Sequence, residues 1–328
     1  MKNLRVNQKE KLHIPIFLAS DDNYIPYLGV TLRSIADSSS PSYVYDIKIL
    51  SSGLTPENVA LLESMDLPNL TLEIVDVCRK MDGIGKLLRL RLRDYYSESI
   101  YYRMFIPSMF PELDKAIYID CDTVLVSDIS EMYFSSLGKN LLAAVVDETV
   151  TPIPVFRDYV REWVGVSADK YFNSGVLVMN LAEMRSCGIE RTFARLVSLY
   201  NFDTVAPDQD YLNFLCRDRV LYLHRGWNKQ PSGDESFPEG KLRLIHYNMF
   251  KKPWRYENVQ YESYFWQTAK RTPFYDRIKR GFDEYTDEKR RTDEEGTLKL
   301  LAAAERLAAT AGGFSRLGEA GRARRSAI

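Results

Sequence analysis

The sequence predicts an α/β fold with a mostly parallel sheet flanked by helices. Over the first 80 residues, short apolar runs alternate with segments of helical period. This β-α-β-α-β order is typical of parallel strands. The chain has 328 residues, of which 45% are hydrophobic and 27% charged, enough to bury one large α/β core or two smaller ones.

The expected strands and helices follow from hydrophobic periodicity and from the residues that start or end each element. A first strand is expected over 13–20, and apolar residues at helical spacing then predict a helix over 24–36. Thr55-Pro56 with Glu57 in the first turn predicts the start of a second helix. The full expected order continues with strand 44–50, helix 55–65, strand 70–77, a helical segment 97–110, strands 115–119, 141–146 and 172–180, a long helix 181–200, a shorter helix 208–216, and short strands and loops over 220–247.

The character of the chain changes after residue 270. A run of mixed charge covers 279–295, and an Ala- and Leu-rich stretch of helical period follows over 297–310. The last residues are rich in Arg and Gly, a composition that favours disorder. We therefore predict a main domain over 1–270 and a charged, helical and partly disordered appendage over 271–328.

Composition excludes several classes of protein. A net charge of -1 and a pI near 6.4 give no overall attraction to nucleic acid. The four cysteines have no paired spacing, so neither a zinc ribbon nor a disulfide framework is expected, and a cytoplasmic location fits. The N-terminal apolar run is too short for a signal peptide, and no stretch is long enough to span a bilayer.

The most informative stretch is the apolar run that ends in Asp120-Cys121-Asp122. Residues i and i+2 of an extended segment point the same way, so both carboxylates can reach one hard cation while Cys121 faces the opposite side. An ordinary acidic turn after a strand is the alternative. Position favours a ligand site, because ligands of parallel sheets collect beyond the carboxyl ends of strands.

No glycine-rich phosphate loop follows the first strand, so neither a dinucleotide fingerprint nor a P-loop is available. A metal held by Asp120 and Asp122 is expected to anchor a diphosphate instead. His246 could complete the metal shell, which favours manganese, with magnesium also workable. Lys252 suits a leaving diphosphate. A structural role for His246 remains an alternative.

Three further segments carry polar residues at strand or helix ends. The turn 19–24 offers acceptors and donors for a base and ribose, with helix capping by Asp22 as the alternative. Asn173 lies beside Gly175 in an apolar strand, where glycine often marks a close approach. The acids that open the segment 206–211 could equally be plain helix capping.

Taken together in order, these motifs resemble glycosyltransferase family 8, the retaining group that includes lipopolysaccharide galactosyl- and glucosyltransferases and glycogenin. The resemblance covers about residues 14–254 and implies a GT-A-type fold, with 1–270 as the catalytic domain. The matching segments are Ala19 through Tyr24, Tyr102-Arg103, the DXD motif Asp120-Cys121-Asp122, Asp147, Asn173-Ser174-Gly175, Asp208-Gln209-Asp210, and His246 through Trp254.

The resemblance also implies roles for these residues. Asp120, Asp122 and His246 would bind Mn²⁺, with Cys121 between them in the donor-binding motif. Ala19, Asp21, Asn23 and Tyr24 would hold the uridine of a UDP-sugar. Arg103, Asp147, Asn173, Asp208 and Gln209 would surround the donor sugar, and Lys252 would contact the diphosphate. The residues expected to carry catalysis are Gln209, Asp208 and Lys252.

The implied reaction moves a galactose or glucose from a UDP-hexose to a saccharide or lipid-linked glycan, in lipopolysaccharide or other cell-surface glycan biosynthesis. Gln209 would lie nearest the β face of the anomeric carbon, and an amide is a poor nucleophile. Front-face displacement is therefore favoured over a covalent intermediate. One departure from the family pattern is Met249, which occupies a position that is often glycine.

Two other functions remain open. The residues Ile119 to Val124 also satisfy the signature of haloacid-dehalogenase-type phosphatases, although that signature normally lies on the first strand of its domain. A catalytically silent sugar-nucleotide-binding protein on the same fold is the second alternative.

The segment 251–271 mixes aromatic with basic residues, a composition compatible with contact at the inner face of a membrane. An aromatic cap over the core is the alternative.

Overall fold

The computed structural model describes residues 11–80, 98–150, 152–232 and 237–317. Its strands are β1 (Leu12–Ala19), β2 (Tyr43–Ser51), β3 (Leu70–Asp76), β4 (Lys115–Ile119), β5 (Thr123–Leu125), β6 (Leu142–Val146), β7 (Phe172–Asn180), β8 (Val220–Tyr222) and β9 (Leu244–His246). Its α-helices are α1 (Ile25–Ser38), α2 (Pro56–Glu63), α3 (Val77–Lys80), α4 (Ile106–Met109), α5 (Ser130–Tyr133), α6 (Pro154–Tyr159), α7 (Leu181–Ser186), α8 (Ile189–Leu199), α9 (Pro207–Cys216), α10 (Glu262–Ala269), α11 (Tyr275–Asp283) and α12 (Asp287–Ala308). Three short 3-10 helices also position the site: η1 (Asp22–Tyr24), η3 (Glu98–Phe105) and η6 (Arg225–Asn228).

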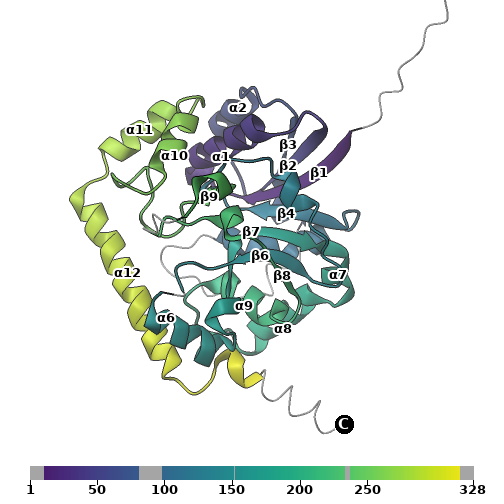
Figure 1. Ribbon diagram of the computed structural model, residues 1–328, viewed down its shortest axis with the longest axis vertical. Coiled ribbons are helices and arrows are strands. Elements are labelled where there is room, and N and C mark those ends of the chain that lie inside the picture. The colour runs from purple at the N-terminus through teal and green to yellow at the C-terminus, as the bar shows by residue number, and fades with distance from the viewer. Residues whose placement is uncertain (1–10, 81–97, 151, 233–236, 318–328) are drawn as a thin grey trace, which may run out of the picture.

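A sheet with the strand order β3-β2-β1-β4-β7-β6-β8 runs through the centre of the molecule (Figure 1). β1 pairs in parallel with β2 and β4, and β2 with β3. β7 is antiparallel to its neighbours β4 and β6, whereas β6 and β8 are parallel. Among the described strands of this sheet, β7 alone is reversed, which confirms the predicted mixed, mostly parallel α/β sheet.

The reversal of β7 decides where the polar residues meet. Asp120 and Asp147 follow the carboxyl ends of β4 and β6, whereas Asn173 lies near the start of β7. The Asp120 N–H donates to the Gly175 carbonyl at 2.8 Å, and the Asp147 N–H donates to the Tyr171 carbonyl at 2.8 Å. The first residues of β7 therefore lie at the same sheet edge as the ends of β4 and β6.

A second, two-stranded sheet brings together residues that are far apart in the sequence. β5 begins directly after Asp122 and pairs antiparallel with β9, so that Thr123 lies opposite His246. The Tyr247 N–H donates to the Asp122 carbonyl at 2.9 Å. From α1, the Thr31 hydroxyl lies within hydrogen-bond distance of the carbonyls of both Cys121 and Thr123. This register places His246 beside the acidic motif.

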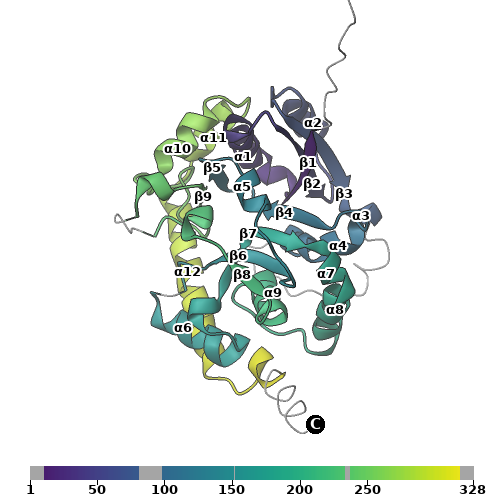
Figure 2. The same ribbon diagram turned by 45° about the vertical axis from the view of Figure 1, so that its right-hand side comes forward.

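Both faces of the sheet are buried at its inner strands β1, β4, β7 and β6, whereas the edge strands β3 and β8 are more exposed. Along β1, Ile14, Ile16 and Leu18 belong to one hydrophobic cluster and Phe17 to the other, as the alternation of side chains requires. The helices α1, α10 and α11 supply residues to the first cluster, and α4, α7, α8 and α9 to the second (Figure 2). Near-continuous apolar runs are expected for strands covered on both sides.

The long helix predicted over 181–200 was wrong. The segment forms two helices, α7 and α8, because the chain turns at Gly188, whose φ is +65°. Glycine adopts this left-handed conformation at little cost. The segment predicted as helical over 97–110 is a 3-10 helix followed by the single turn of α4 in its described part.

The chain after residue 270 is helical in its described part. α12 runs along one side of the molecule from α11 to α6 (Figure 1). Leu300, Ala304 and Leu307 of α12 are buried in the same cluster as Phe156 of α6. The division at residue 270 stays a prediction. The disorder was predicted for the Arg-rich end from Arg316 on, which is helical as far as residue 317, and the rest of that end lies outside the described ranges.

Candidate active site

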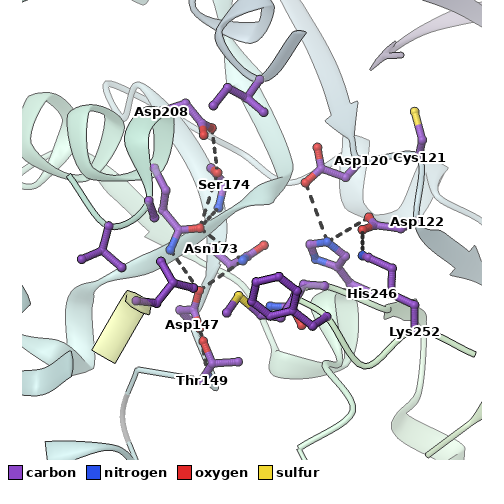
Figure 3. Close-up of a pocket in the computed structure, with 18 of the residues that line it drawn as sticks. Asp120, Cys121, Asp122, Asp147, Thr149, Asn173, Ser174, Asp208, His246 and Lys252 are labelled. Atoms are coloured by element: carbon purple, nitrogen blue, oxygen red, sulfur yellow. Dashed lines mark hydrogen bonds and ion pairs between the residues drawn. The ribbon is translucent and has the colours of Figure 1, made fainter. Parts of the chain in front are cut away.

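A cavity of about 550 Å³ opens where the carboxyl ends of β1, β4 and β6 meet the start of β7. Every residue that the sequence assigned to the site lines this cavity except Asn23, which is exposed. The labelled side chains form two groups, one on either side of the cavity (Figure 3). We term Asp120, Asp122, His246 and Lys252 the metal edge, and Asp147, Asn173, Ser174, Asp208 and Gln209 the carboxamide cage.

The metal edge brings three potential ligands to one point. Asp122 Oδ1 lies 3.1 Å and Asp120 Oδ2 3.7 Å from His246 Nε2. One ligand atom from each of the three residues lies within 4.8 Å of the others. The Cys121 thiol faces away and donates to the Ala19 carbonyl at 3.1 Å. The two carboxylates therefore converge as the alternation along the motif predicts.

Asp120 is oriented by a buried arginine. Arg103 Nη2 lies 2.9 Å from Asp120 Oδ1, and its Nε lies 3.2 Å from Asp208 Oδ2. Its Nη1 donates to the Ser174 carbonyl at 2.5 Å, and its guanidinium lies 4.2 Å from the centre of the Tyr118 ring. Burial by itself lowers the pKa of Arg103, but the two carboxylates outweigh burial and raise it. Arg103 is therefore a fixed cation.

Asp122 is oriented by a lysine. Its Oδ2 accepts from Lys252 Nζ at 2.5 Å, and the same ammonium donates to the Tyr247 carbonyl at 2.6 Å. Burial acts to raise the pKa of Asp122, but Lys252 and His246 lower it well below its usual range. Asp122 is therefore ionised, with one oxygen held by lysine and the other directed at His246.

The donor set fits a divalent cation. Asp122 Oδ1 is buried and receives no hydrogen bond from any residue that the structure describes. A buried carboxylate oxygen without a donor is costly unless a cation compensates it. Two carboxylates and an imidazole form a mixed set of oxygen and nitrogen ligands. Such a set favours ions such as Mn²⁺ over Ca²⁺, which prefers oxygen ligands alone.

The carboxamide cage is a closed hydrogen-bond network. Gln209 Nε2 donates to Asp147 Oδ2 at 3.0 Å, while Gln209 Oε1 accepts from the Ser174 N–H at 3.0 Å and from Asn173 Nδ2 at 3.2 Å. Asp208 Oδ2 accepts from the Ser174 hydroxyl at 3.0 Å. Burial raises the pKa of Asp208, and Arg103 opposes the rise. These groups present fixed donors and acceptors to a hydroxylated ligand.

A further buried carboxylate supports the cage from α9. Asp210 accepts from the hydroxyls of Tyr159 and Tyr171, both at 2.6 Å, and from the Ala206 N–H at 3.1 Å. Burial raises the pKa of Asp210 to about 6, although the two tyrosine hydroxyls act to lower it. The acids at the start of α9 thus do more than cap it, because Asp208 pairs with Arg103 instead.

The turn 19–24 forms the other end of the cavity. Asp21, rather than Asp22, caps the following helix: its Oδ1 accepts from the N–H groups of Asn23 and Tyr24. Asp22 instead accepts from the Thr55 N–H at 2.7 Å, and this hydrogen bond lowers the pKa of Asp22. The capping role considered for Asp22 therefore belongs to its neighbour.

Met249 adopts the conformation that the glycine of the family pattern would favour. Its φ is +60°, in the left-handed region, and its side chain is partly exposed at the cavity. The loop between His246 and Lys252 thus keeps a left-handed residue although a Cβ is present, which carries a conformational cost.

Sequence reasoning missed part of the wall. Tyr285, Asp293 and Leu300, all in the C-terminal segment, line the cavity. Asp293 Oδ2 accepts from Tyr285 at 2.7 Å and from Tyr256 at 3.1 Å. It also missed Asn228, a fully buried residue bonded to His246. No motif or spacing marks these residues, since only the packing of distant elements brings them to the site.

The aromatic segment 251–271 packs against the core. Trp254 and Phe265 are each 2% exposed, and the rings of Tyr27 and Trp254 stack at 4.1 Å. Partly buried neighbours such as Tyr264 and Trp266 pack on the same cluster. This favours the aromatic cap over a free aromatic surface. In the described residues, no helix combines the length and the apolar character needed to cross a membrane.

Known proteins are similar to this chain in sequence and in fold. Residues 15–258 match the sequence profile described as glycosyl transferase family 8. A lipopolysaccharide 1,2-glucosyltransferase of Escherichia coli (strain K12) is 28% identical over 279 residues, covering 78% of each chain. General stress protein A of Bacillus subtilis (strain 168) is 25% identical over 268 residues, covering 76% of this chain and 89% of that one.

Solved structures agree on the GT-A fold. The bifunctional glycosyltransferase WbbM superimposes with a TM-score of 0.71 at 26% identity, covering 84% of this chain and 52% of that one. This chain thus spans about half of WbbM. The galactosyltransferase LgtC, solved with donor and acceptor sugar analogues, superimposes with a TM-score of 0.64 at 24% identity, covering 79% of this chain and 96% of that one.

The family match decides between the functions left open by the acidic motif. It extends over well more than half of the chain and includes both the metal edge and the carboxamide cage. A dehalogenase-type phosphatase is thereby set aside. The chain belongs to glycosyltransferase family 8 and is a glycosyltransferase.

Proposed function

We propose that the protein is a metal-dependent, retaining hexosyltransferase that uses a UDP-sugar donor. Galactose or glucose is the proposed sugar, and a saccharide or lipid-linked glycan of the cell surface is the proposed acceptor. The lipopolysaccharide 1,2-glucosyltransferase relative supports the acceptor class. The observation that carries the proposal is the convergence of Asp120, Asp122 and His246 beside Lys252, opposite a buried cage of carboxamides.

At the metal edge, Asp120, Asp122 and His246 would hold Mn²⁺, with Mg²⁺ as a workable substitute. A cation held by these residues would offset the negative charge of the diphosphate. Lys252 uses two N–H groups on Asp122 and the Tyr247 carbonyl. Because an ammonium has three donors, one is left for a phosphate oxygen.

The turn 19–24 would receive the nucleoside. Ala19, Asp21 and Tyr24 line the cavity and would hold uridine, together with Cys121 of the acidic motif. The Asp21 carboxylate has one oxygen on the helix cap, so its second oxygen is available to a ligand. Asn23 is exposed, so its proposed contact with the nucleoside requires the side chain to turn toward the cavity.

The carboxamide cage would hold the donor hexose. Together with Arg103, which lies beside the cage, its side chains offer the donors and acceptors that sugar hydroxyls need. The proposed contacts in the cage are Asp147, Asn173, Asp208 and Gln209. Gln209 is an amide held by Ser174 and Asp147. It is suited to stabilising positive charge at the anomeric carbon rather than to forming a covalent bond.

Retention would then follow from front-face displacement. The bond between the anomeric carbon and the leaving phosphate oxygen breaks, and the acceptor oxygen bonds to the same face. The acceptor proton passes to the departing phosphate. The chain's part in this step is to align acceptor and donor and to hold the leaving diphosphate with Lys252.

The test is release of UDP from a panel of UDP-hexoses with Mn²⁺, with and without EDTA. Asp122→Asn is expected to lower release by more than about 100-fold, beyond the usual effect of losing a residue that merely supports a metal ligand. Asp218→Asn, at an exposed carboxylate, is the matched control and should leave release unchanged. Full release by the Asp122 variant at limiting Mn²⁺ would rule out this metal site.

The same assay addresses the silent alternative. If UDP binds but no UDP-hexose is turned over with any metal, the protein is a sugar-nucleotide-binding member of the family.

A peripheral membrane contact through 251–271 remains a proposal about location. It predicts that exchanging the exposed Lys270 and Arg271 for Ser lowers binding to anionic liposomes.

A further inference from the structure

Asn228 joins the two sides of the cavity. Its side chain is fully buried on η6. Asn228 Oδ1 lies 2.9 Å from His246 Nδ1, and Asn228 Nδ2 donates to Asn173 Oδ1 at 2.9 Å. Thus the carboxamide contacts one proposed metal ligand and one member of the carboxamide cage.

The backbone fixes Asn228 beside β9. The His246 N–H donates to the Lys229 carbonyl at 2.9 Å, and the Lys229 N–H donates to the Leu244 carbonyl at 2.9 Å. Gly226 packs so closely on the Lys241 carbonyl that a Cβ would overlap it. The 3-10 helix can therefore hold Asn228 next to the His246 ring without relying on the side chain itself.

The donors and acceptors of this network can be assigned by starting from groups that can only donate or only accept a hydrogen bond. A backbone N–H can only donate, so the Asn173 atom that lies 3.0 Å from the Gly175 nitrogen is the amide oxygen. The other Asn173 atom, Nδ2, then donates to the Asp147 carboxylate at 3.1 Å. Both contacts agree on one orientation of the Asn173 amide.

The orientation of the Asn173 amide determines the orientation of the Asn228 amide, which in turn determines which nitrogen of His246 carries the proton. Because Asn173 Oδ1 is an acceptor, the Asn228 atom facing it is the NH₂ group, and Asn228 Oδ1 faces the imidazole. An oxygen acceptor 2.9 Å from Nδ1 requires the proton on that nitrogen. In the neutral ring, Nε2 then carries a lone pair directed at Asp122 and Asp120, as a metal ligand needs.

We propose that Asn228 is a positioning residue that fixes the tautomer and the plane of His246, and so prepares Nε2 to bind the metal. The inference rests on the proposed metal site. Asn228 does not contact the metal in this scheme, but acts through His246. It also ties the metal edge to the carboxamide cage, since the orientation of Asn228 is set by Asn173 and Asp147.

Two substitutions separate positioning from packing. Asn228→Leu keeps the branched shape of the side chain but removes the acceptor, and we expect Mn²⁺ affinity to fall by about 10- to 100-fold. Asn228→Asp keeps an acceptor for the Nδ1 proton although it loses the donor to Asn173, so affinity should fall less than in Asn228→Leu. Asn180→Ala removes amide hydrogen bonds at the opposite end of β7 and is the matched control.

Mn²⁺ affinity is measured by electron paramagnetic resonance of the free ion, without donor or acceptor. Equal affinity of the Leu variant and the original protein would overturn the proposal while leaving the metal site intact. Original protein that does not bind Mn²⁺ would overturn the proposed function instead.

A second readout needs no metal. The chain has three histidines, so nuclear magnetic resonance with ¹⁵N-labelled histidine gives three imidazoles to assign. The substitutions His13→Asn and His224→Asn each remove one of the other two sets of signals and so identify those of His246. The proposal expects a protonated Nδ1 and a bare Nε2 in neutral His246, and loss of this preference in Asn228→Leu. Neutral His246 with its proton on Nε2 and a bare Nδ1 in the original protein would overturn it.

Discussion

The metal edge and the carboxamide cage each depend on a buried carboxylate, and the two carboxylates behave oppositely. Asp122 is bonded to Lys252 and lies beside His246, and its pKa is lowered. Asp210 is bonded to the hydroxyls of Tyr159 and Tyr171, and its pKa is raised to about 6. Burial acts to raise both pKa values: the cations beside Asp122 outweigh it, whereas the hydroxyls beside Asp210 do not.

This difference shows what each side of the cavity is built to receive. At the metal edge, cations already hold the outer oxygens, and among the described residues the inner oxygen of Asp122 is buried without a donor. That arrangement needs a further cation. In the cage, most partners are hydroxyls and amides with fixed hydrogen-bond directions. Such a surface recognises neutral hydroxyl groups by geometry rather than by charge.

The largest expected effect comes from the glycine between the two regions. A Cβ at Gly175 would overlap Asp120 Oδ2 and the His246 ring, and would crowd Asn173 Oδ1. Gly175→Ala should therefore displace the metal ligands and lower UDP release by roughly 1000-fold, the scale of losing a central catalytic interaction. Isothermal titration with Mn²⁺ checks whether metal binding is lost along with turnover.

The matched control is Gly240→Ala, because a Cβ there meets no atom of the described residues within 4 Å. It should leave both Mn²⁺ binding and UDP release unchanged. Circular dichroism must show the same folded spectrum for both variants. A folded Gly175 variant with full Mn²⁺ affinity would mean that the metal does not lie between Asp120 and His246.

A smaller effect separates the two carboxylates by pH. Asp210 has a pKa of about 6 in the folded protein against an ordinary 3.8, so the folded state binds its proton more tightly. The stability that this group contributes is complete below about pH 4 and is lost as the pH rises through about 6. Relative to Asp210→Asn, the original protein should lose roughly 2 kcal/mol of unfolding free energy between about pH 4 and pH 7.

Urea denaturation of both proteins across this range measures the difference directly. Tyr171→Phe sharpens the test, because the Tyr171 hydroxyl acts to lower the pKa of Asp210. Removing that hydroxyl should move the loss of stability to higher pH. A difference between Asp210→Asn and the original protein that stays flat over the whole range would contradict the raised pKa.

The sequence predicted most of this architecture, because it depends on local signals. Apolar strands, capping residues and the position of the acidic motif after β4 are all visible in one dimension. The predicted helix over 181–200 failed at Gly188, since a glycine within a helical pattern does not reveal whether the chain will turn there.

Residues of the site could be predicted only where they belong to a recognisable sequence motif. His246 could be singled out by its chemistry, but its place opposite Thr123 depends on the register of β5 and β9. Asn228 carries no pattern, because its role arises from where η6 packs. Asp293 and Leu300 looked like parts of a solvated charged or helical appendage, and only the packing of α12 brings them to the cavity.

The smallest effect concerns Met249, where the chain departs from its family. A non-glycine residue at φ +60° costs about 1 kcal/mol or slightly more. Met249→Gly should therefore raise the unfolding free energy by about 0.5 kcal/mol, after the greater freedom of glycine in the unfolded chain is subtracted. Turnover should change little, since Asn228, Asp122 and the Tyr247 carbonyl hold His246 and Lys252 independently of the loop. Met249→Ala keeps the strain and should show no gain, so equal stabilisation by both variants would trace the effect to the methionine side chain.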